Sequence, residues 1–377
     1  MNKIEYQAEL FGNRLKKKYK ELRKWARKNR ISCYRLYDRD IPEVPVSLDL
    51  YEFLPDGIDS PIEAARFLSD QNARLSANDP GVENGIKERT YAVLYLYERP
   101  YEKDENEEQA WLNAMAATAA EVLGISLEHV VKKMRGHKSH KGSQYEKLDP
   151  TIYSSPITGL TQEQGQLFKL DLTTYLDTGL FFDHRVLRAM VRDTCSKKRV
   201  LNLFCYTSSF SVYAAQGNAG YVESVDLSNT YLDWSKQNMK LNGFTDKKRY
   251  VFTRADCMRF LQEKAVAAKS GKLTPQELYD IIILDPPTFS NSKATTDVLD
   301  INRDWPQLVK DCLNILAPGG TLYFSTNSER IKFDVSKLPP KTITGLEFSC
   351  EEITEQSIPL DYTGKKPHRL WRFDLKK

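Results

Sequence analysis

Long apolar runs and paired cysteines are both missing from this 377-residue sequence. No apolar stretch approaches the about 20 residues that a membrane-spanning helix needs, so we expect no membrane association. The six cysteines are scattered without paired spacing, which fits a reducing compartment such as the cytoplasm and argues against a zinc site. His137 and His140 have no cysteine or carboxylate partner nearby, so we expect no bound metal.

Positive charge is concentrated near the start, although the net charge is only +4. Residues 13–30 hold ten Lys or Arg against the single acid Glu21, while four apolar residues recur at helical spacing. This pattern predicts a helix with one apolar face, which is either a solvated surface helix or a helix that contacts nucleic-acid phosphates. A second basic run, 132–145, is typical of a loop that touches phosphate. The candidate RNA-binding residues are Arg14, Lys16, Lys17, Lys18, Lys20, Arg23, Lys24, Arg27, Lys132, Lys133, Arg135, Lys138 and Lys141.

Acidic residues end three successive predicted strands in the second half of the chain. After the apolar strand 199–204, the segments 221–226, 250–256 and 279–285 end in Asp226, Asp256 and Asp285, respectively. Ligands of open α/β sheets collect outside the carboxyl ends of the strands. Asp226 follows the first turn by about 20 residues, the interval typical of a ribose-binding carboxylate. A single such Asp is often a helix N-cap, but three in order, the last within Asp-Pro-Pro, favour a cofactor site.

This order of strands and acids resembles the class I S-adenosylmethionine-dependent methyltransferases. The segments 176–185, 202–207, 231–238, 241–244 and 284–293 are similar to the RlmK half of the bacterial bifunctional RlmKL enzymes, and the likeness extends upstream to residues 13–17 and 33–38. The resemblance implies S-adenosylmethionine as cofactor and methylation of a guanine at N7 in large-subunit (23S) ribosomal RNA. It also implies that the partner is this RNA or a precursor of the large ribosomal subunit.

The resemblance assigns roles to particular residues. The second-strand acid holds the ribose, the third-strand Asp and its successor read the adenine edge, and the fourth-strand motif faces cofactor and target base. Asp183 and Arg185 are expected to pair with the ammonium and carboxylate of the cofactor, although an internal salt bridge is an equal alternative for each. The expected cofactor-binding residues are Gly179, Phe182, Asp183, Arg185, Asn202, Phe204, Cys205, Tyr206, Thr207, Ser208, Asp226, Leu227, Ser228, Asp256, Cys257 and Asp285, and the expected catalytic residues are Asp285, Pro286, Pro287, Thr288 and Phe289.

The sequence departs from the resembling family in two respects. Ser208 occupies a turn position where glycine is usual, because glycine lets a backbone approach the cofactor at any φ; cofactor affinity is the property that this affects. The second departure is the absence of the partner half, which in the resembling enzymes methylates guanine at N2; a separate protein is one source of that activity.

The expected fold is α/β, with a smaller basic α+β domain before a Rossmann-like methyltransferase domain with a seven-stranded sheet. The predicted limits are 1–148 for an RNA-binding domain, 149–172 for a β-hairpin connector and 173–377 for the methyltransferase domain. Within the first domain, residues 54–89 are polar and rich in turn formers, so we expect a loop with one short helix near 61–75.

The chemistry leaves four alternatives, of which guanine N7 is favoured. N7 has a lone pair and no proton to remove, so direct displacement needs no base. Methylation at cytosine C5 needs a nucleophilic cysteine, and none follows the fourth or fifth strand. Exocyclic guanine N2 ranks second, since Thr288 stands where such enzymes usually place an aromatic residue. The last alternative is a non-catalytic RNA-binding assembly factor, which Ser208 favours and the three acids oppose.

Overall fold

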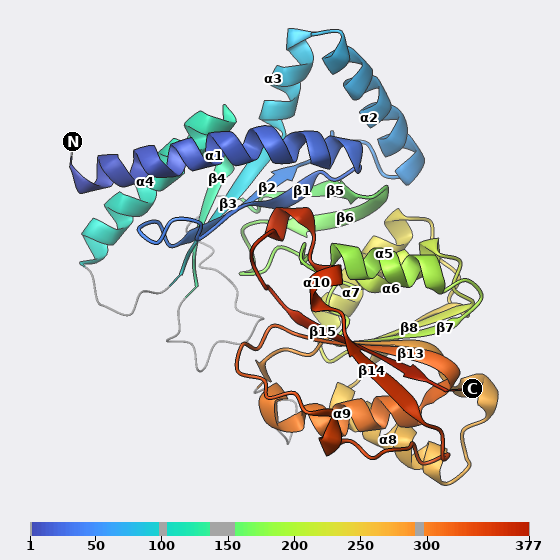
Figure 1. Ribbon diagram of the computed structural model, residues 1–377. Coiled ribbons are helices and arrows are strands. Elements are labelled where there is room, and N and C mark those ends of the chain that lie inside the picture. Colours follow the sequence, from blue (N-terminus) through green and yellow to red (C-terminus); the bar gives the residue numbers. More distant parts are fainter. Residues whose placement is uncertain (1, 98–103, 136–154, 291–297, 377) are drawn as a thin grey trace. The chain divides into compact units, whose positions relative to one another are not determined.

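The computed structural model describes residues 2–97, 104–135, 155–290 and 298–376 (Figure 1). It divides into two compact units, Met1–Phe182 and Asp183–Lys377, which we describe separately. The hairpin of β5 (Thr158–Glu163) and β6 (Gln166–Asp171) belongs to the first unit, because its carbonyls at Gln162 and Leu160 accept from the amides of Ser32 and Leu54. Within the described ranges no helix is long and apolar enough to cross a membrane.

A four-stranded sheet forms the first unit's centre. Its strands run in the order β1 (Cys33–Asp38), β2 (Val46–Glu52), β3 (Thr90–Tyr97) and β4 (Val130–Arg135), and only the last pair is parallel. Helices α1 (Lys3–Lys28) and α4 (Glu105–Leu123) pack on it and share its apolar core. Close packing of these helices depends on Gly12, since a Cβ there would lie 3.0 Å from the Thr118 methyl group.

The predicted amphipathic helix near the start is therefore observed. Leu15, Leu22 and Ala26 of its apolar stripe are buried, and Tyr19 is partly buried. The polar segment 54–89 differs from the expected loop, because it contains two helices, α2 (Pro61–Ser76) and α3 (Pro80–Glu88). Both begin with an N-cap side chain, Ser60 and Asp79, followed by proline, a start signal that the sequence shows at both places.

The second unit is built on a seven-stranded sheet, as expected. Its order is β14 (Phe348–Glu352), β15 (Arg369–Leu375), β13 (Leu316–Thr326), β10 (Tyr279–Leu284), β7 (Arg199–Leu203), β8 (Tyr221–Asp226) and β9 (Tyr250–Arg254). The five strands from β13 to β9 pair in parallel, and β15 runs antiparallel to both of its neighbours. The chain moves outward from β7 to β8 and β9, then returns to β10 on the other side of β7. This reversal is the topological switch point at which such sheets bind ligands.

Helices cover both faces of this sheet. Figure 1 shows α5 (Arg185–Thr194), α6 (Ser209–Gln216) and α7 (Asn229–Leu241) on one face, with α8 (Cys257–Lys269) and α9 (Ile301–Asn314) on the other. The short elements are β11 (Phe289–Ser290), β12 (Leu299–Asp300), α10 (Thr354–Ser357) and four 3₁₀ turns, Leu127–His129, Pro275–Glu277, Val335–Lys337 and Leu360–Tyr362. Most residues of the central strands β7, β8 and β10 are buried, and the apolar runs of β7 and β10 are typical of such strands.

Candidate active site

The turn after β7 carries three residues in the left-handed backbone region. Phe204, Tyr206 and Ser208 have φ values of 53°, 50° and 60°. Such values cost non-glycine residues roughly 1–2 kcal/mol each, and they cluster at functional sites. The turn thus adopts a glycine-like conformation without glycine.

Ser208 shows how one of these strained residues is held. Its side chain is fully buried, and its hydroxyl donates to the Ser235 hydroxyl on α7 at 2.7 Å. Its amide donates to the Cys205 carbonyl, also at 2.7 Å. Serine at the usual glycine position therefore preserves the turn, and its side chain points into the fold.

Asp226 fastens this turn to the end of β8. One carboxylate oxygen accepts from the Tyr206 amide at 3.0 Å, and the other accepts from the Ser228 amide at 2.9 Å. The side chain is largely buried, and burial raises the pKa of Asp226 despite these two amides. A carboxylate oxygen accepts more than one hydrogen bond, so the group retains capacity for a ribose hydroxyl. Leu227 and Ser228 follow it, and the Ser228 hydroxyl caps α7.

Asp256 has the role of a helix cap at the end of β9. Its Oδ1 accepts from the amides of Met258 and Arg259 at the start of α8, at 2.8 and 3.1 Å. Cys257 is buried, and its sulfur accepts from the Phe204 amide at 3.3 Å. The thiol therefore supports the turn after β7. If Cys257 contacts the adenine of the cofactor, its backbone atoms make the contact.

The remaining predicted residues of the turn are also directed inward. The Asn202 amide donates to the Ser211 hydroxyl at 2.9 Å, and the Thr207 carbonyl accepts from the side-chain amide of Asn238 at 3.0 Å. The side chains of Asn202, Cys205 and Thr207 are buried. These residues shape the turn, and a ligand there would contact backbone atoms.

The fourth-strand motif offers a more accessible carboxylate. The Asp285 side chain is 28% exposed just beyond β10, whereas Pro286 is buried and Pro287 is half-buried. The Thr288 hydroxyl donates to the Asn327 side chain beyond β13 at 2.5 Å. Phe289 is 53% exposed and starts β11.

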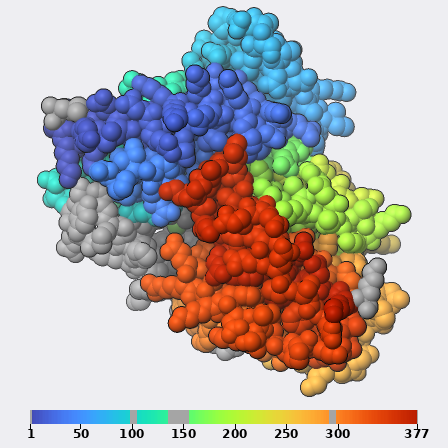
Figure 2. All heavy atoms as spheres, in the orientation of Figure 1, coloured from blue at the N-terminus to red at the C-terminus, as the bar shows by residue number. Residues whose placement is uncertain are grey.

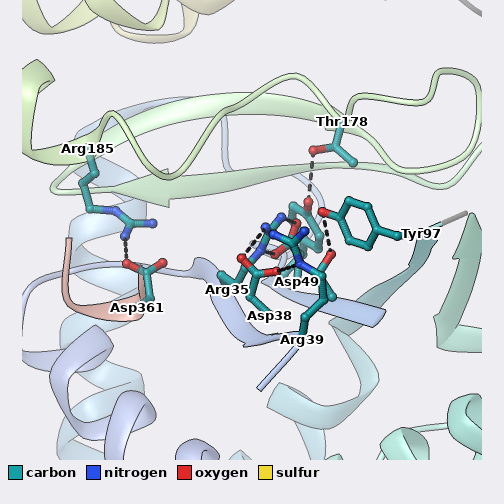
Figure 3. Close-up of polar contacts among 10 residues, drawn as sticks. Arg35, Asp38, Arg39, Asp49, Tyr97, Thr178, Arg185 and Asp361 are labelled. Atoms are coloured by element: carbon teal, nitrogen blue, oxygen red, sulfur yellow. Dashed lines mark hydrogen bonds and ion pairs between the residues drawn. The ribbon is translucent and has the colours of Figure 1, made fainter. Parts of the chain in front are cut away.

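Arg185 requires a correction. Its guanidinium donates to the Asp361 carboxylate at 2.8 Å, and both side chains are almost fully buried (Figure 3). The internal salt bridge is thus the correct alternative, because a buried charge needs a partner and Asp361 supplies it. Gly179, with φ of 111°, and Phe182, whose ring lies 5.5 Å from that of Tyr51, belong to the first unit.

A buried histidine cluster, which sequence reasoning missed, lies beside Asp285. The His184 Nε2 is 2.7 Å from the Ser325 hydroxyl and 3.5 Å from the Asp285 Oδ1. Its Nδ1 is 3.3 Å from Asp183, whose carboxylate also contacts the His368 Nδ1 at 3.0 Å. Only the segment Phe-Asp-His-Arg185 signalled part of this cluster, since His368 lies more than 180 residues away.

Charges within this cluster stabilise one another. Burial alone would lower the pKa of His184, but the carboxylates of Asp285 and Asp183 outweigh it and raise the pKa to about 9. Burial likewise opposes ionisation of Asp183, yet His184 and His368 hold the pKa of Asp183 well below its usual value. These contacts favour an imidazolium on His184 beside a carboxylate on Asp183 at neutral pH.

The cluster also brings together three groups of the types that bind metals, Asp183, His184 and His368. The two imidazole rings are stacked, with centroids 4.5 Å apart and planes 18° from parallel. In-plane nitrogen lone pairs of stacked rings do not converge on one ion about 2 Å from each. The His368 Nε2 lies 2.8 Å from the Ser357 hydroxyl, so the arrangement is that of a hydrogen-bonded network.

The predicted RNA-binding residues of the first unit differ in exposure. Lys16, Lys17, Lys20 and Lys24 are exposed on α1, which Figure 2 shows in dark blue at the surface. Arg14 and Lys18 both pair with Asp40, at 2.7 and 3.0 Å. Arg23 and Arg27 are half-buried, and Lys132 donates to Asn113 at 2.7 Å. Arg135 ends β4, and Lys138 and Lys141 lie outside the described residues, as do His137 and His140.

Lys133 is a second correction. Its side chain is buried, and its ammonium donates to the carbonyls of Tyr175 and Leu176 at 2.7 and 2.9 Å. Alternate residues of a strand face opposite sides, so Lys133 points inward whereas its neighbour Lys132 reaches a surface side chain. A buried ammonium bound to two carbonyls is not available to a phosphate.

Another ionic cluster of the first unit is structural. Arg35 on β1 contacts Asp49 on β2 at 2.7 Å and Asp38 at 3.5 Å, and Arg39 pairs with Asp38 (Figure 3). The Tyr51 hydroxyl is hydrogen-bonded to the Thr178 hydroxyl at 3.0 Å. These contacts hold the sheet and the segment after β6 together.

Comparison with known proteins supports the cofactor assignment. Residues 116–339 match the family described as S-adenosylmethionine-dependent methyltransferase. The chain is 38% identical over 362 residues to the ribosomal RNA large subunit methyltransferase K of Neisseria meningitidis, covering 96% of this chain and 86% of that protein. It is 36% identical to the methyltransferase K/L of Magnetococcus marinus, but spans only 43% of that longer protein.

A solved structure shows the same fold. A candidate methyltransferase complexed with SAH has a TM-score of 0.64 at 20% identity, covering 97% of this chain and 81% of that one. The carboxyl-edge acids, the left-handed turn at the switch point and the family match together fit S-adenosylmethionine as cofactor. The chain therefore belongs to the S-adenosylmethionine-dependent methyltransferase family, in the group of the ribosomal RNA large subunit methyltransferases K.

Proposed function

We propose that this enzyme methylates a guanine at N7 in 23S ribosomal RNA, or in a precursor of the large ribosomal subunit, in the cytoplasm. The names of the relatives support an RNA substrate of this class. The observation that carries the choice of atom is a fourth-strand motif with a partly exposed carboxylate, Asp285, and no thiol beside it.

The states of the cysteines support direct displacement. All six lie among the described residues, and Cys205 and Cys257, at the ends of β7 and β9, are buried. Burial raises the pKa of both thiols, that of Cys257 well above its usual value. Since the thiolate is the nucleophile, neither suits the covalent attack that cytosine C5 requires.

The chemistry at N7 makes modest demands on the protein. Bound S-adenosylmethionine supplies an electrophilic methyl group; its S–CH3 bond breaks as the N7–CH3 bond forms, the bonding electrons stay on sulfur, and the purine becomes cationic. In our proposal Asp226 holds the cofactor ribose, the backbone of the β7 turn and Asp256 line the pocket, and Asp285 faces the base. Alignment and exclusion of water then provide the rate enhancement.

Target access fits a basic first unit. N7 lies in the major groove, which in A-form RNA is too narrow for side chains, so the guanine must be unpaired or flipped out. The exposed lysines of α1 would bind flanking phosphates and offset the cost of flipping, a few kcal/mol. We propose this helix, with the accessible part of the 132–145 run, as the RNA-binding surface.

The test is transfer of labelled methyl to large-subunit RNA that lacks its modifications, followed by nucleoside analysis by mass spectrometry. We expect 7-methylguanosine, and we expect Asp285→Ala to abolish it. Asp233→Ala is a matched control, because Asp233 is exposed on α7 and pairs with the exposed Lys236.

Each alternative has its own signature in this experiment. Label at guanine N2, the second-ranked target, or at cytosine C5 would keep the enzyme class and contradict N7. RNA binding without cofactor binding or methyl transfer would favour the assembly factor. The left-handed conformation kept at Ser208 supports cofactor binding over that last possibility.

A further inference from the structure

The histidine cluster connects the fourth-strand motif to three other segments of the second unit. His184 is the residue before α5, Asp285 follows β10, Ser325 is in β13 and His368 directly precedes β15. The side chains of His184, Ser325 and His368 are more than nine-tenths buried. Asp183 is 13% exposed, and Asp285 is the most accessible of the group. The proposed function uses Asp285 but gives no role to His184, Asp183 or His368.

We propose that His184 is a positioning residue that holds the carboxylate of Asp285 toward the target base, and that Asp183 and His368 hold His184 in place. This inference rests on the proposed methyl transfer at this site. Its geometry is a continuous chain of contacts, from the Asp285 Oδ1 through both ring nitrogens of His184 to Asp183 and then to His368.

Packing leaves His184 little freedom. Its ring stacks on His368 and meets the Phe210 ring of α6 edge-on, with centroids 5.8 Å apart. Ser325 fixes the direction of Nε2 at 2.7 Å. The same nitrogen therefore faces Asp285 from a defined position, which is what a preorganised carboxylate requires.

The charged groups around the ring favour its protonated form. Asp183 and Asp285 face it, and Arg188 on α5, one turn away, opposes them. His368 shares the Asp183 carboxylate, and Arg185 is neutralised by Asp361. A protonated ring donates from both nitrogens, so it binds Asp183 and directs its positive charge to Asp285 at the same time.

The proposed role of Asp285 explains why its position matters. A purine methylated at N7 becomes cationic, so a carboxylate fixed beside the base stabilises charge that develops in the transition state. A carboxylate that rotated freely would lose that alignment, and small misplacements cost about 100-fold in rate. Loss of the His184 contact should therefore lower the rate constant kcat more than it weakens substrate binding.

Kinetics of His184→Gln test the inference. We expect kcat to fall about 10- to 100-fold, with the KM for RNA and the Kd for SAH changed less than threefold. In the wild type, kcat should fall at alkaline pH as His184 loses its proton, and this fall should be absent from His184→Gln. Ionisation of guanine itself affects both enzymes equally. His129→Gln is the matched control, because His129 stacks on Tyr91 in the first unit, and it should leave kcat unchanged.

Opposite results overturn the inference. If His184→Gln keeps kcat within threefold of wild type, or if only SAH binding weakens, His184 does not position Asp285. A merely structural role would lower the folded fraction without changing the pH profile.

A second measurement applies even if that variant does not fold. Titration of 15N-labelled histidines by NMR, without substrate, should show a lower midpoint for His184 in Asp285→Asn than in wild type. Equal midpoints would refute the contact. Because this readout needs no methyl transfer, it is separate from the proposed function, which fails instead if the product is not 7-methylguanosine.

Discussion

At the scale of single residues, the site combines groups that the fold neutralises with groups that it leaves available. Arg185 is matched by Asp361, and the Cys257 thiol supports a turn. Asp285 retains partial exposure. Residue type alone does not separate these roles, because each depends on whether a partner lies within hydrogen-bonding distance.

His184 should make folding stability depend on alkaline pH. Its pKa is about 9 in the folded protein against an ordinary value of 6.5, a difference worth roughly 3 kcal/mol. The sign follows from the raised pKa: this contribution is complete below pH 6.5 and is lost as pH rises through 9. Urea unfolding of wild type and His184→Gln should show a stability difference that shrinks over this range. A constant difference would contradict the assignment.

Asp226 should control cofactor affinity. Asp226→Asn keeps the size of the side chain but removes the charge, and it exchanges one acceptor for an amide that cannot serve both Tyr206 and Ser228. We expect SAH binding to weaken about 10-fold or more, since hydrogen bonds to charged groups are worth about 1.5–3 kcal/mol. Calorimetric titration measures this, with Asp233→Asn as the control on the same side of the sheet. Unchanged affinity would remove Asp226 from the site.

At the scale of elements, the turn after β7 stores backbone strain. Ser208→Gly would relieve a left-handed serine but lose the hydrogen bond to Ser235, two effects of about 1 kcal/mol that nearly cancel. Ser208→Ala keeps the strain and loses the bond, so it should destabilise by about 1–2 kcal/mol. Chemical denaturation of both variants tests this. Equal stability of the two would show that φ at this position carries no cost.

The helix α1 combines an apolar face with an exposed row of lysines. Replacing Lys16, Lys17, Lys20 and Lys24 by Gln should weaken RNA binding and reduce the slope of log affinity against log salt by roughly 3, if each contacts a phosphate. The matched control changes the exposed Lys236, Lys240, Lys247 and Lys248 of the second unit. If both quadruple variants bind RNA with the same affinity and salt dependence, the lysines of α1 do not contact RNA.

At the scale of the whole molecule, the chain contains two compact units with separate cores. We expect two transitions in calorimetric unfolding, of which only that of residues 183–377 rises with SAH. At a ligand concentration of 100 times Kd the stabilisation should be about 2.7 kcal/mol. A single transition that shifts as a whole would mean that the units unfold together.

The sequence by itself determined the sheet and the family. Strands β7 and β10 are largely buried and largely apolar, and the acids at or just beyond the ends of β8, β9 and β10 appear directly as letters at regular intervals. The amphipathic helix α1 is equally predictable from the 3.6-residue period of its apolar residues. These features are local, so local patterns predict them. The helix α3 was missed although its Asp-Pro start is visible, because the surrounding segment is polar and rich in turn formers.

Only the tertiary structure decided which charged residues have partners inside the protein. Arg185 and Asp361, like His184 and His368, meet across more than 170 residues of sequence, and Lys133 finds two carbonyls from a distant segment. Whether a charge faces ligand or partner depends on desolvation and on a contact of a few ångströms. No periodicity encodes such distances, because they arise when strands far apart in the chain become neighbours in one sheet.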